Sequence, residues 1–191
     1  MRRFLDRTYE TGLWLSAACI ALIAALVLLQ VGGRLLDRLL LAVDLPRTGF
    51  AVPSLAEIGA FLFVASSFLA LACTFRAGAH IRVTLFSKLM GPRLARMADL
   101  FSLALASAIA LFAAWHSWVQ ALDSYTFGSV SFGVIKIPLA LPQGAMSLGI
   151  TLLAIALLDE LVGVWRTGSL SFESADKTAE TGAQAPQTAG H

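Results

Sequence analysis

Charged residues, cysteines and histidines are all scarce in this sequence. Of its 191 residues 14% are charged and 58% are hydrophobic, and the mean hydropathy is +0.77. A soluble domain carries about 25% charged residues, so this composition excludes an ordinary soluble protein. The net charge of +2, with no basic run longer than Arg2-Arg3, lacks the signature of nucleic-acid binding. We expect an all-α integral membrane protein.

Motifs of catalysis and of cofactor binding are also missing. The sequence contains no GxxxxGK, HExxH or GxSxG pattern, which argues against an ATPase, a zinc protease and a serine hydrolase. Both cysteines, Cys19 and Cys73, lie in apolar runs, where cysteine usually packs as a small hydrophobic residue. Of three histidines only His116 lies in such a run, so a haem with two histidine ligands lacks its partner. We expect no enzymatic activity, no cofactor and no metal.

Four long runs without Asp, Glu, Lys or Arg stand out instead. They cover residues 11–33, 58–75, 100–122 and 137–158. At about 1.5 Å per residue even the shortest reaches about 27 Å, close to the thickness of a bilayer core. The first run is too long for the apolar region of a secretory signal, although Arg2-Arg3 precedes it. The sequence therefore predicts four membrane-spanning helices, the first of them uncleaved.

The positive residues predict the orientation. Ten of the 14 Lys and Arg residues fall in the N-terminal segment, the second connection and the tail, and four fall in the first and third connections. Because cytoplasmic loops are enriched in Lys and Arg, both termini are expected in the cytoplasm. We expect residues 1–166 to form one four-helix membrane domain. Residues 167–191, rich in Ser, Thr, Ala, Gly and acidic residues, are expected to be a disordered cytoplasmic tail.

Two connections carry helical patterns of their own. In residues 34–53 a series of leucines continues the spacing of the first run, which predicts either an extension of that helix or a separate surface helix. Its apolar stripe suits a partner protein or the lipid interface equally. In residues 80–96 apolar residues and cations alternate as in an interfacial amphipathic helix, and Pro92 fits the first turn of the third spanning helix.

Glu57, at the start of the second run, is the most informative carboxylate. Ser54 precedes it by three residues, the spacing of a capping box in which each side chain bonds the other residue's backbone N–H. A polar contact with a partner subunit is a second interpretation. Transport of an ion or a proton is a third, because ionisable residues near a membrane core are often functional.

Small residues recur every four positions in three of the runs. The series are Ala17, Ala21 and Ala25; Ser102, Ala106, Ala110 and Ala114; and Ala145 with Gly149. Such faces let helix backbones approach closely in a membrane. Alanine is also common in these helices, so composition alone is the alternative explanation.

The order of motifs around the second run resembles a known family. Glu57 and an apolar helix are followed by Arg76-x-Gly78-x-His80-Ile81-Arg82-Val83. This order resembles the small membrane subunit of tripartite ATP-independent periplasmic (TRAP) transporters, the DctQ-like family, over about residues 9–165. The segment Ile137-Pro138-Leu139-Ala140-Leu141-Pro142 is a second point of likeness, although the family often has Trp at the position of Ala140.

The resemblance implies an accessory subunit of the bacterial inner membrane. It implies pairing with a large permease subunit, which holds the substrate and ion sites, and with a periplasmic substrate-binding protein. The assembly would import organic acids, driven by an ion gradient. An independent small channel or transporter and a subunit of a membrane redox complex remain the alternatives.

Seven residues are candidates for contact with a partner or with membrane lipids. Arg76, His80 and Arg82 could bind headgroups, hold a partner's loop, or only set the topology. The full set is Glu57, Arg76, His80, Arg82, Ala106, Ala110 and Pro138.

Overall fold

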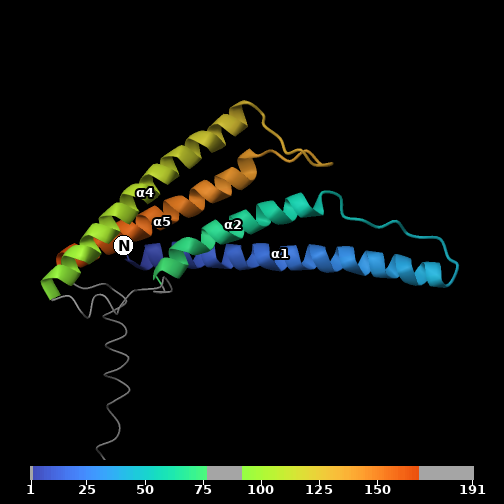
Figure 1. The fold of residues 1–191 in the computed structure, drawn as a ribbon, viewed down its shortest axis with the longest axis horizontal. Coiled ribbons are helices and arrows are strands. Elements are labelled where there is room, and N and C mark those ends of the chain that lie inside the picture. The colour runs from blue at the N-terminus through green and yellow to red at the C-terminus, as the bar shows by residue number, and fades with distance from the viewer. Residues whose placement is uncertain (1, 77–91, 168–191) are drawn as a thin grey trace, which may run out of the picture.

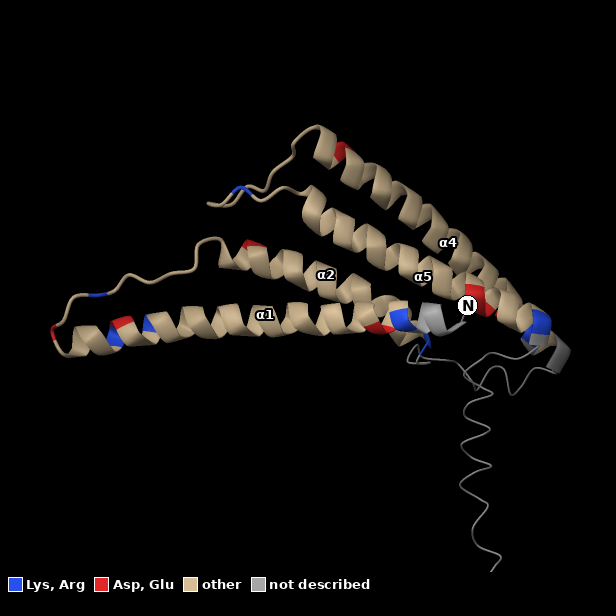
Figure 2. Ribbon diagram, turned by 180° about the vertical axis from the view of Figure 1, so that it is seen from behind, with Lys and Arg blue, Asp and Glu red and all other residues tan. Residues whose placement is uncertain are grey.

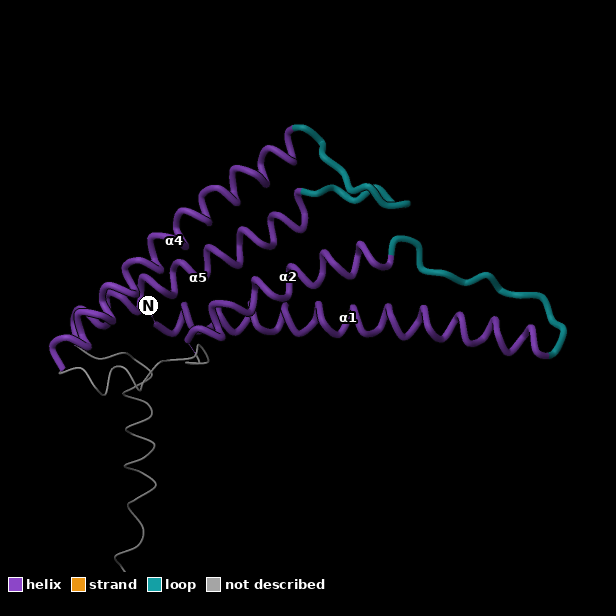
Figure 3. Tube along the Cα trace, viewed as in Figure 1, coloured by secondary structure: helices purple, strands orange, loops and turns teal. Residues whose placement is uncertain are grey.

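The computed structural model describes residues 2–76 and 92–167, and four long helices make up most of this part (Figure 1 and Figure 3). The helices are α1 (Arg2–Ala42), α2 (Leu55–Arg76), α4 (Pro92–Thr126) and α5 (Ala140–Thr167). Each is long and apolar enough to cross a membrane. The prediction of an all-α protein with four potential spanning helices is therefore confirmed. Charged residues concentrate toward the helix ends and the connections (Figure 2).

The helices form an open layer in the order α1, α2, α5, α4. The main contacts between elements are those of α1 with α2, α2 with α5, and α5 with α4. Figure 1 shows that the α1–α2 pair and the α4–α5 pair meet near the start of α1 and diverge toward the opposite end. We call these the converging end and the open end. The chain enters α1 and leaves α5 at the converging end.

α5 joins the two pairs of helices. One buried cluster contains Ala154 and Leu157 of α5 packed against Leu103 and Ala110 of α4. A second cluster joins Ala156, again from α5, to α1 and α2 through Tyr9 and Ala72. Within an 18-residue hydrophobic stretch taken from each helix, 39% of α5 is buried, against 11% of α1. Most of the α1 surface must therefore face lipid or another protein.

Glycines mark the closest backbone contacts. A Cβ atom at Gly149 of α5 would overlap the carbonyl of Phe68 in α2. A Cβ at Gly12 of α1 would lie 3.0 Å from the carbonyl oxygen of Leu69. Because lipid removes the hydrophobic driving force between helices, close van der Waals contact of this kind is what holds them together.

Serine hydroxyls add hydrogen bonds across the same interfaces. Ser16 of α1 donates to the carbonyl oxygen of Ser66 in α2 over 2.8 Å. The hydroxyls of Ser117 in α4 and Ser147 in α5 are 2.8 Å apart and share a hydrogen bond. Such bonds between membrane helices contribute about 0.6 kcal/mol each on average, so they fix the pairing more than they stabilise it.

The first connection begins as an extension of α1. The helix continues to Ala42, nine residues past the predicted span, so the helical-extension interpretation holds as far as that residue. The chain then folds back along α1. The Asp37 carboxylate accepts hydrogen bonds from the backbone N–H groups of Thr48 and Gly49, and the Gln30 side chain accepts one from the N–H of Val52 over 2.6 Å.

The fourth helix starts later than predicted. The expected span began at residue 137, but α5 begins at Ala140. The preceding residues form an isolated antiparallel bridge between Val130 and Pro138. The N–H of Leu139 donates to the carbonyl oxygen of Ser129. This part of the chain is therefore hydrogen-bonded within the loop, and the helix begins only after it.

α4 begins at Pro92, as predicted. The proposed interfacial helix in residues 80–96 falls outside the described residues up to residue 91. The proposed disordered tail also lies outside them, apart from residue 167.

Candidate functional site

Ser54 and Glu57 hold the connection between α4 and α5 against the start of α2. The N–H of Gly133 donates to Glu57 Oε1 over 3.2 Å. The N–H of Ile135 donates to Ser54 Oγ over 3.0 Å. We refer to these two hydrogen bonds as the loop clamp. It joins the two helix pairs at the open end, where their helices diverge (Figure 1).

The loop clamp replaces the predicted capping box. A capping box requires Ser54 Oγ to accept from the N–H of Glu57. That N–H donates instead to the carbonyl oxygen of Ser54, over 3.0 Å, and Ser54 has a positive φ of 53°. The capping-box prediction is therefore wrong, because both side chains turn away from the helix toward residues far along the chain.

Gly133 lies directly against the Glu57 carboxylate. A Cβ atom at this position would overlap the Glu57 carboxylate. The second carboxylate oxygen, Oε2, is buried and has no hydrogen-bond partner among the residues that the structure describes. Because this oxygen is buried, it is closed to a donor from outside the chain while the loop stays in place.

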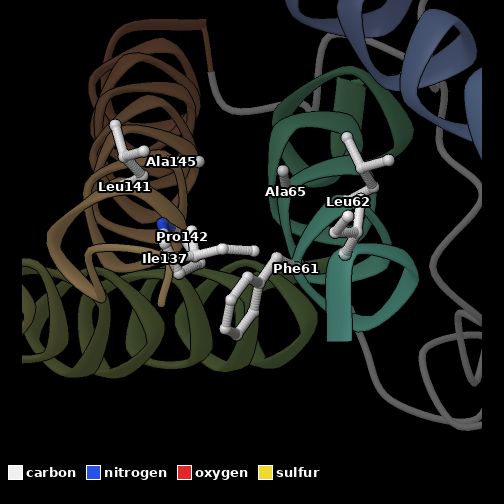
Figure 4. A pocket seen from close by; sticks show the side chains of 8 residues that line it. Phe61, Leu62, Ala65, Ile137, Leu141, Pro142 and Ala145 are labelled. Carbon is white, nitrogen blue, oxygen red and sulfur yellow. The ribbon is translucent and has the colours of Figure 1, made fainter. Parts of the chain in front are cut away.

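An apolar groove separates α2 from the start of α5, close to the loop clamp (Figure 4). Its volume is about 240 Å³. All of its lining residues are apolar: Ile58, Phe61, Leu62, Ala65, Ile137, Leu141, Pro142 and Ala145. The groove can take an apolar chain or side chain, and its lining offers no side-chain group to hold a polar solute.

Arg76 lies at the converging end, away from the loop clamp. Its guanidinium carbon is 5.2 Å from the centroid of the Tyr9 ring, within the range of a cation–π contact. Tyr9 is buried, so this contact joins the end of α2 to the start of α1. His80 and Arg82, the other members of the predicted basic group, lie outside the described residues.

The predicted docking face of α4 is covered by α5. Ala110 is buried in the cluster that α4 shares with α5, and Ala106 packs against the same cluster. This packing argues against both alanines as contacts for a second subunit. Pro138 is exposed in the connection that the loop clamp holds.

Sequence reasoning missed a polar ladder between α4 and α5. Ser147 donates to the carbonyl oxygen of Gln143, and Thr151 donates to that of Ser147. The Thr151 hydroxyl also accepts a hydrogen bond from the Trp118 indole N–H over 3.1 Å. The sequence does indicate this ladder through the spacing of four residues between Gln143, Ser147 and Thr151, which places them on one helix face.

Residues 2–76 and 92–167 contain no group of three or more His, Cys, Asp or Glu side chains placed to hold a metal ion. The His116 ring contacts the Phe112 ring at a tilt of 55°, with ring centroids 4.3 Å apart.

Comparison with known proteins identifies the family. The family model described as "Tripartite ATP-independent periplasmic transporters, DctQ component" matches residues 23–167, well over half of the chain. The chain belongs to the DctQ family. The match begins within α1 and ends with α5, so it includes the loop clamp and the apolar groove. No curated protein and no solved structure matches the chain significantly.

Membership of the DctQ family gives the chain a general role. DctQ proteins are the small permease component of TRAP transporters, not a family of enzymes. Together with four helices apolar enough to span a bilayer, this indicates a multi-pass protein of the inner membrane that takes part in transmembrane transport.

Proposed function

We propose that this chain is an accessory subunit that braces the large permease subunit of a TRAP transporter. The transporter would import organic acids in symport with ions, together with a periplasmic substrate-binding protein. The observation that carries the proposal is the open layer of helices. In the part of the chain that the structure describes, the main helix contacts run from α1 to α2, α5 and α4 without closing into a ring, so these helices enclose no polar path for a solute.

The charges of the connections support an orientation with both termini in the cytoplasm. The open end, with the loop clamp and the groove, then faces the periplasm. The converging end, with Arg76 on Tyr9, lies at the cytoplasmic side. His80 and Arg82 remain proposed contacts with headgroups or with a partner at that side.

The face that we propose for docking is on α1. Ala17, Ala21 and Ala25 are exposed, whereas Ser16 and Gly12 of the same helix are buried toward α2. An exposed series of small residues lets another helix approach closely without a hydrophobic driving force. We therefore assign this role to α1 in place of Ala106 and Ala110.

Glu57 and Pro138 belong to a second proposed contact. The loop clamp holds a loop whose Phe132 and Val134 side chains are almost completely exposed. Glu57 would act by fixing this loop, and with it the two exposed apolar side chains that would contact the large subunit.

The direct test is purification of the tagged chain from gently solubilised native membranes, followed by mass spectrometry. The expected result is a large polytopic membrane protein in a near-equal amount. Recovery of the chain alone, together with solute uptake by the chain alone in liposomes, would instead indicate an independent transporter.

A further inference from the structure

Three arginines gather where α1 extends past its charge-free run. Arg34 and Arg38 lie four residues apart on one face of the helix. The chain that folds back brings Arg47 beside them, and the three line a pocket of about 330 Å³ with Asp37 and Leu41. Like charges at this spacing on a helix repel each other. The site therefore favours a bound anion.

The carboxylate in this pocket, that of Asp37, already has hydrogen-bond donors within the chain. Asp37 accepts hydrogen bonds from the N–H and the hydroxyl of Thr48 and from the N–H of Gly49. These bonds hold the returning chain, and with it Arg47, against α1. Among the described residues neither Arg34 nor Arg38 has an ion-pair partner. The pocket thus has an excess of positive charge, with three arginines against one carboxylate.

The length of the charge-free run places the pocket near the membrane surface. Residues 11–33 reach about 34 Å, slightly more than a hydrocarbon core of about 30 Å. Arg34, the next residue, falls at the edge of that core, and Arg38 lies about 6 Å further along the helix axis. The headgroup layer occupies about 5–7 Å on each side of the core. Both arginines therefore lie at the depth of lipid phosphates.

The apolar residues between the arginines favour lipid over a soluble acidic partner. Leu35, Leu39 and Val43 are 57%, 58% and 70% exposed. Side chains of this kind would be hydrated in the aqueous phase, whereas at the interface they enter the acyl region while the cations stay with the headgroups. Figure 2 shows the basic residues concentrated at this end of α1.

We propose that Arg34, Arg38 and Arg47 form a binding site for the phosphate of an anionic phospholipid, in the leaflet at the C-terminal end of α1. The guanidinium groups supply paired donors that match phosphate oxygens. The inference rests on α1 crossing the membrane and not on the proposed partner subunit.

Lipid binding to the purified full-length chain tests the site. Phosphatidylglycerol would be titrated into the chain in a neutral detergent, and bound lipid counted by native mass spectrometry. Each arginine near a membrane surface contributes about fivefold to binding, so Arg34→Gln with Arg38→Gln should weaken the tightest lipid site by about 25-fold. Arg38→Lys should weaken it less, because lysine keeps the charge and loses the paired donors.

Lys136→Gln is the matched control, since it removes one positive charge at the same end of the molecule but outside the pocket. It should leave the tightest site unchanged. Diacylglycerol, which has the chains without the phosphate, should not compete. If millimolar inorganic phosphate displaced the phosphatidylglycerol, the arginines would still form an anion site, but its ligand would be a free anion and not a lipid.

Equal lipid affinity of the wild type and the double variant, with normal helix content by circular dichroism, would overturn the proposal. Unchanged lipid affinity combined with lost binding of the periplasmic substrate-binding protein would also overturn it, and would assign the arginines to an acidic protein surface.

Discussion

Glu57 shows how one residue can be identified from the sequence while its contacts cannot. Its place at the edge of an apolar run marked it as important, and the local spacing suggested a capping box. The actual partners, Gly133 and Ile135, lie 76 and 81 residues from Glu57 and Ser54 respectively. No local pattern encodes such a contact, so only the fold assigns the carboxylate to the loop clamp.

The loop clamp predicts a difference between two substitutions of Glu57. Glu57→Gln keeps an oxygen that can accept from the N–H of Gly133, whereas Glu57→Ala removes it. Since hydrogen bonds to charged groups contribute about 1.5–3 kcal/mol, we expect the Ala variant to raise the exchange rate of the Gly133 amide, which donates to Glu57, by about tenfold or more. Hydrogen–deuterium exchange measures this directly. Equal exchange in both variants and the wild type would contradict the clamp.

At the scale of the helices, the sequence predicted the spans well and their ends poorly. Charge-free runs locate the spans because lipid excludes charge. α1 continues through Gly32 and Gly33 to Ala42, because its leucines keep the helical spacing and no proline occurs before Pro46. The start of α5 is delayed by the isolated bridge between Pro138 and Val130, which depends on how the loop between α4 and α5 folds. Small-residue faces were visible too, but not which helix covers each one.

Gly149 provides the test of the α2–α5 contact. A methyl group at this position would overlap the backbone of Phe68, so Gly149→Ala forces the two helices apart. Overpacking of this kind costs about 1–3 kcal/mol, and we expect a lower Tm of the detergent-solubilised chain. Gly144→Ala is the control, because its Cβ has no neighbour within 4 Å and alanine favours the helix. A Tm that falls equally in both variants would show that the helix crossing is not as close as described.

The whole molecule has an asymmetry that the separate helices do not reveal. α5 packs on both sides, whereas α1 packs mainly on α2 and leaves most of its membrane surface uncovered. An element with so little internal packing needs either lipid or a partner around it. This is why we propose the small-residue series of α1 as the docking surface, in place of Ala106 and Ala110 of α4, which the sequence alone indicated.

Ala21→Leu with Ala25→Leu tests that surface. The added side chains project from an exposed face, so the chain itself should fold and retain its Tm. A helix packed closely on this face would be pushed outward, and we expect the large subunit to be lost from the complex during purification in detergent. Ala104→Leu with Ala108→Leu makes the same change at exposed positions of α4 and should leave the complex intact. If the α4 pair dissociates the complex while the α1 pair does not, the large subunit binds the opposite edge of the layer. If neither pair has an effect, the small-residue face of α1 contacts lipid.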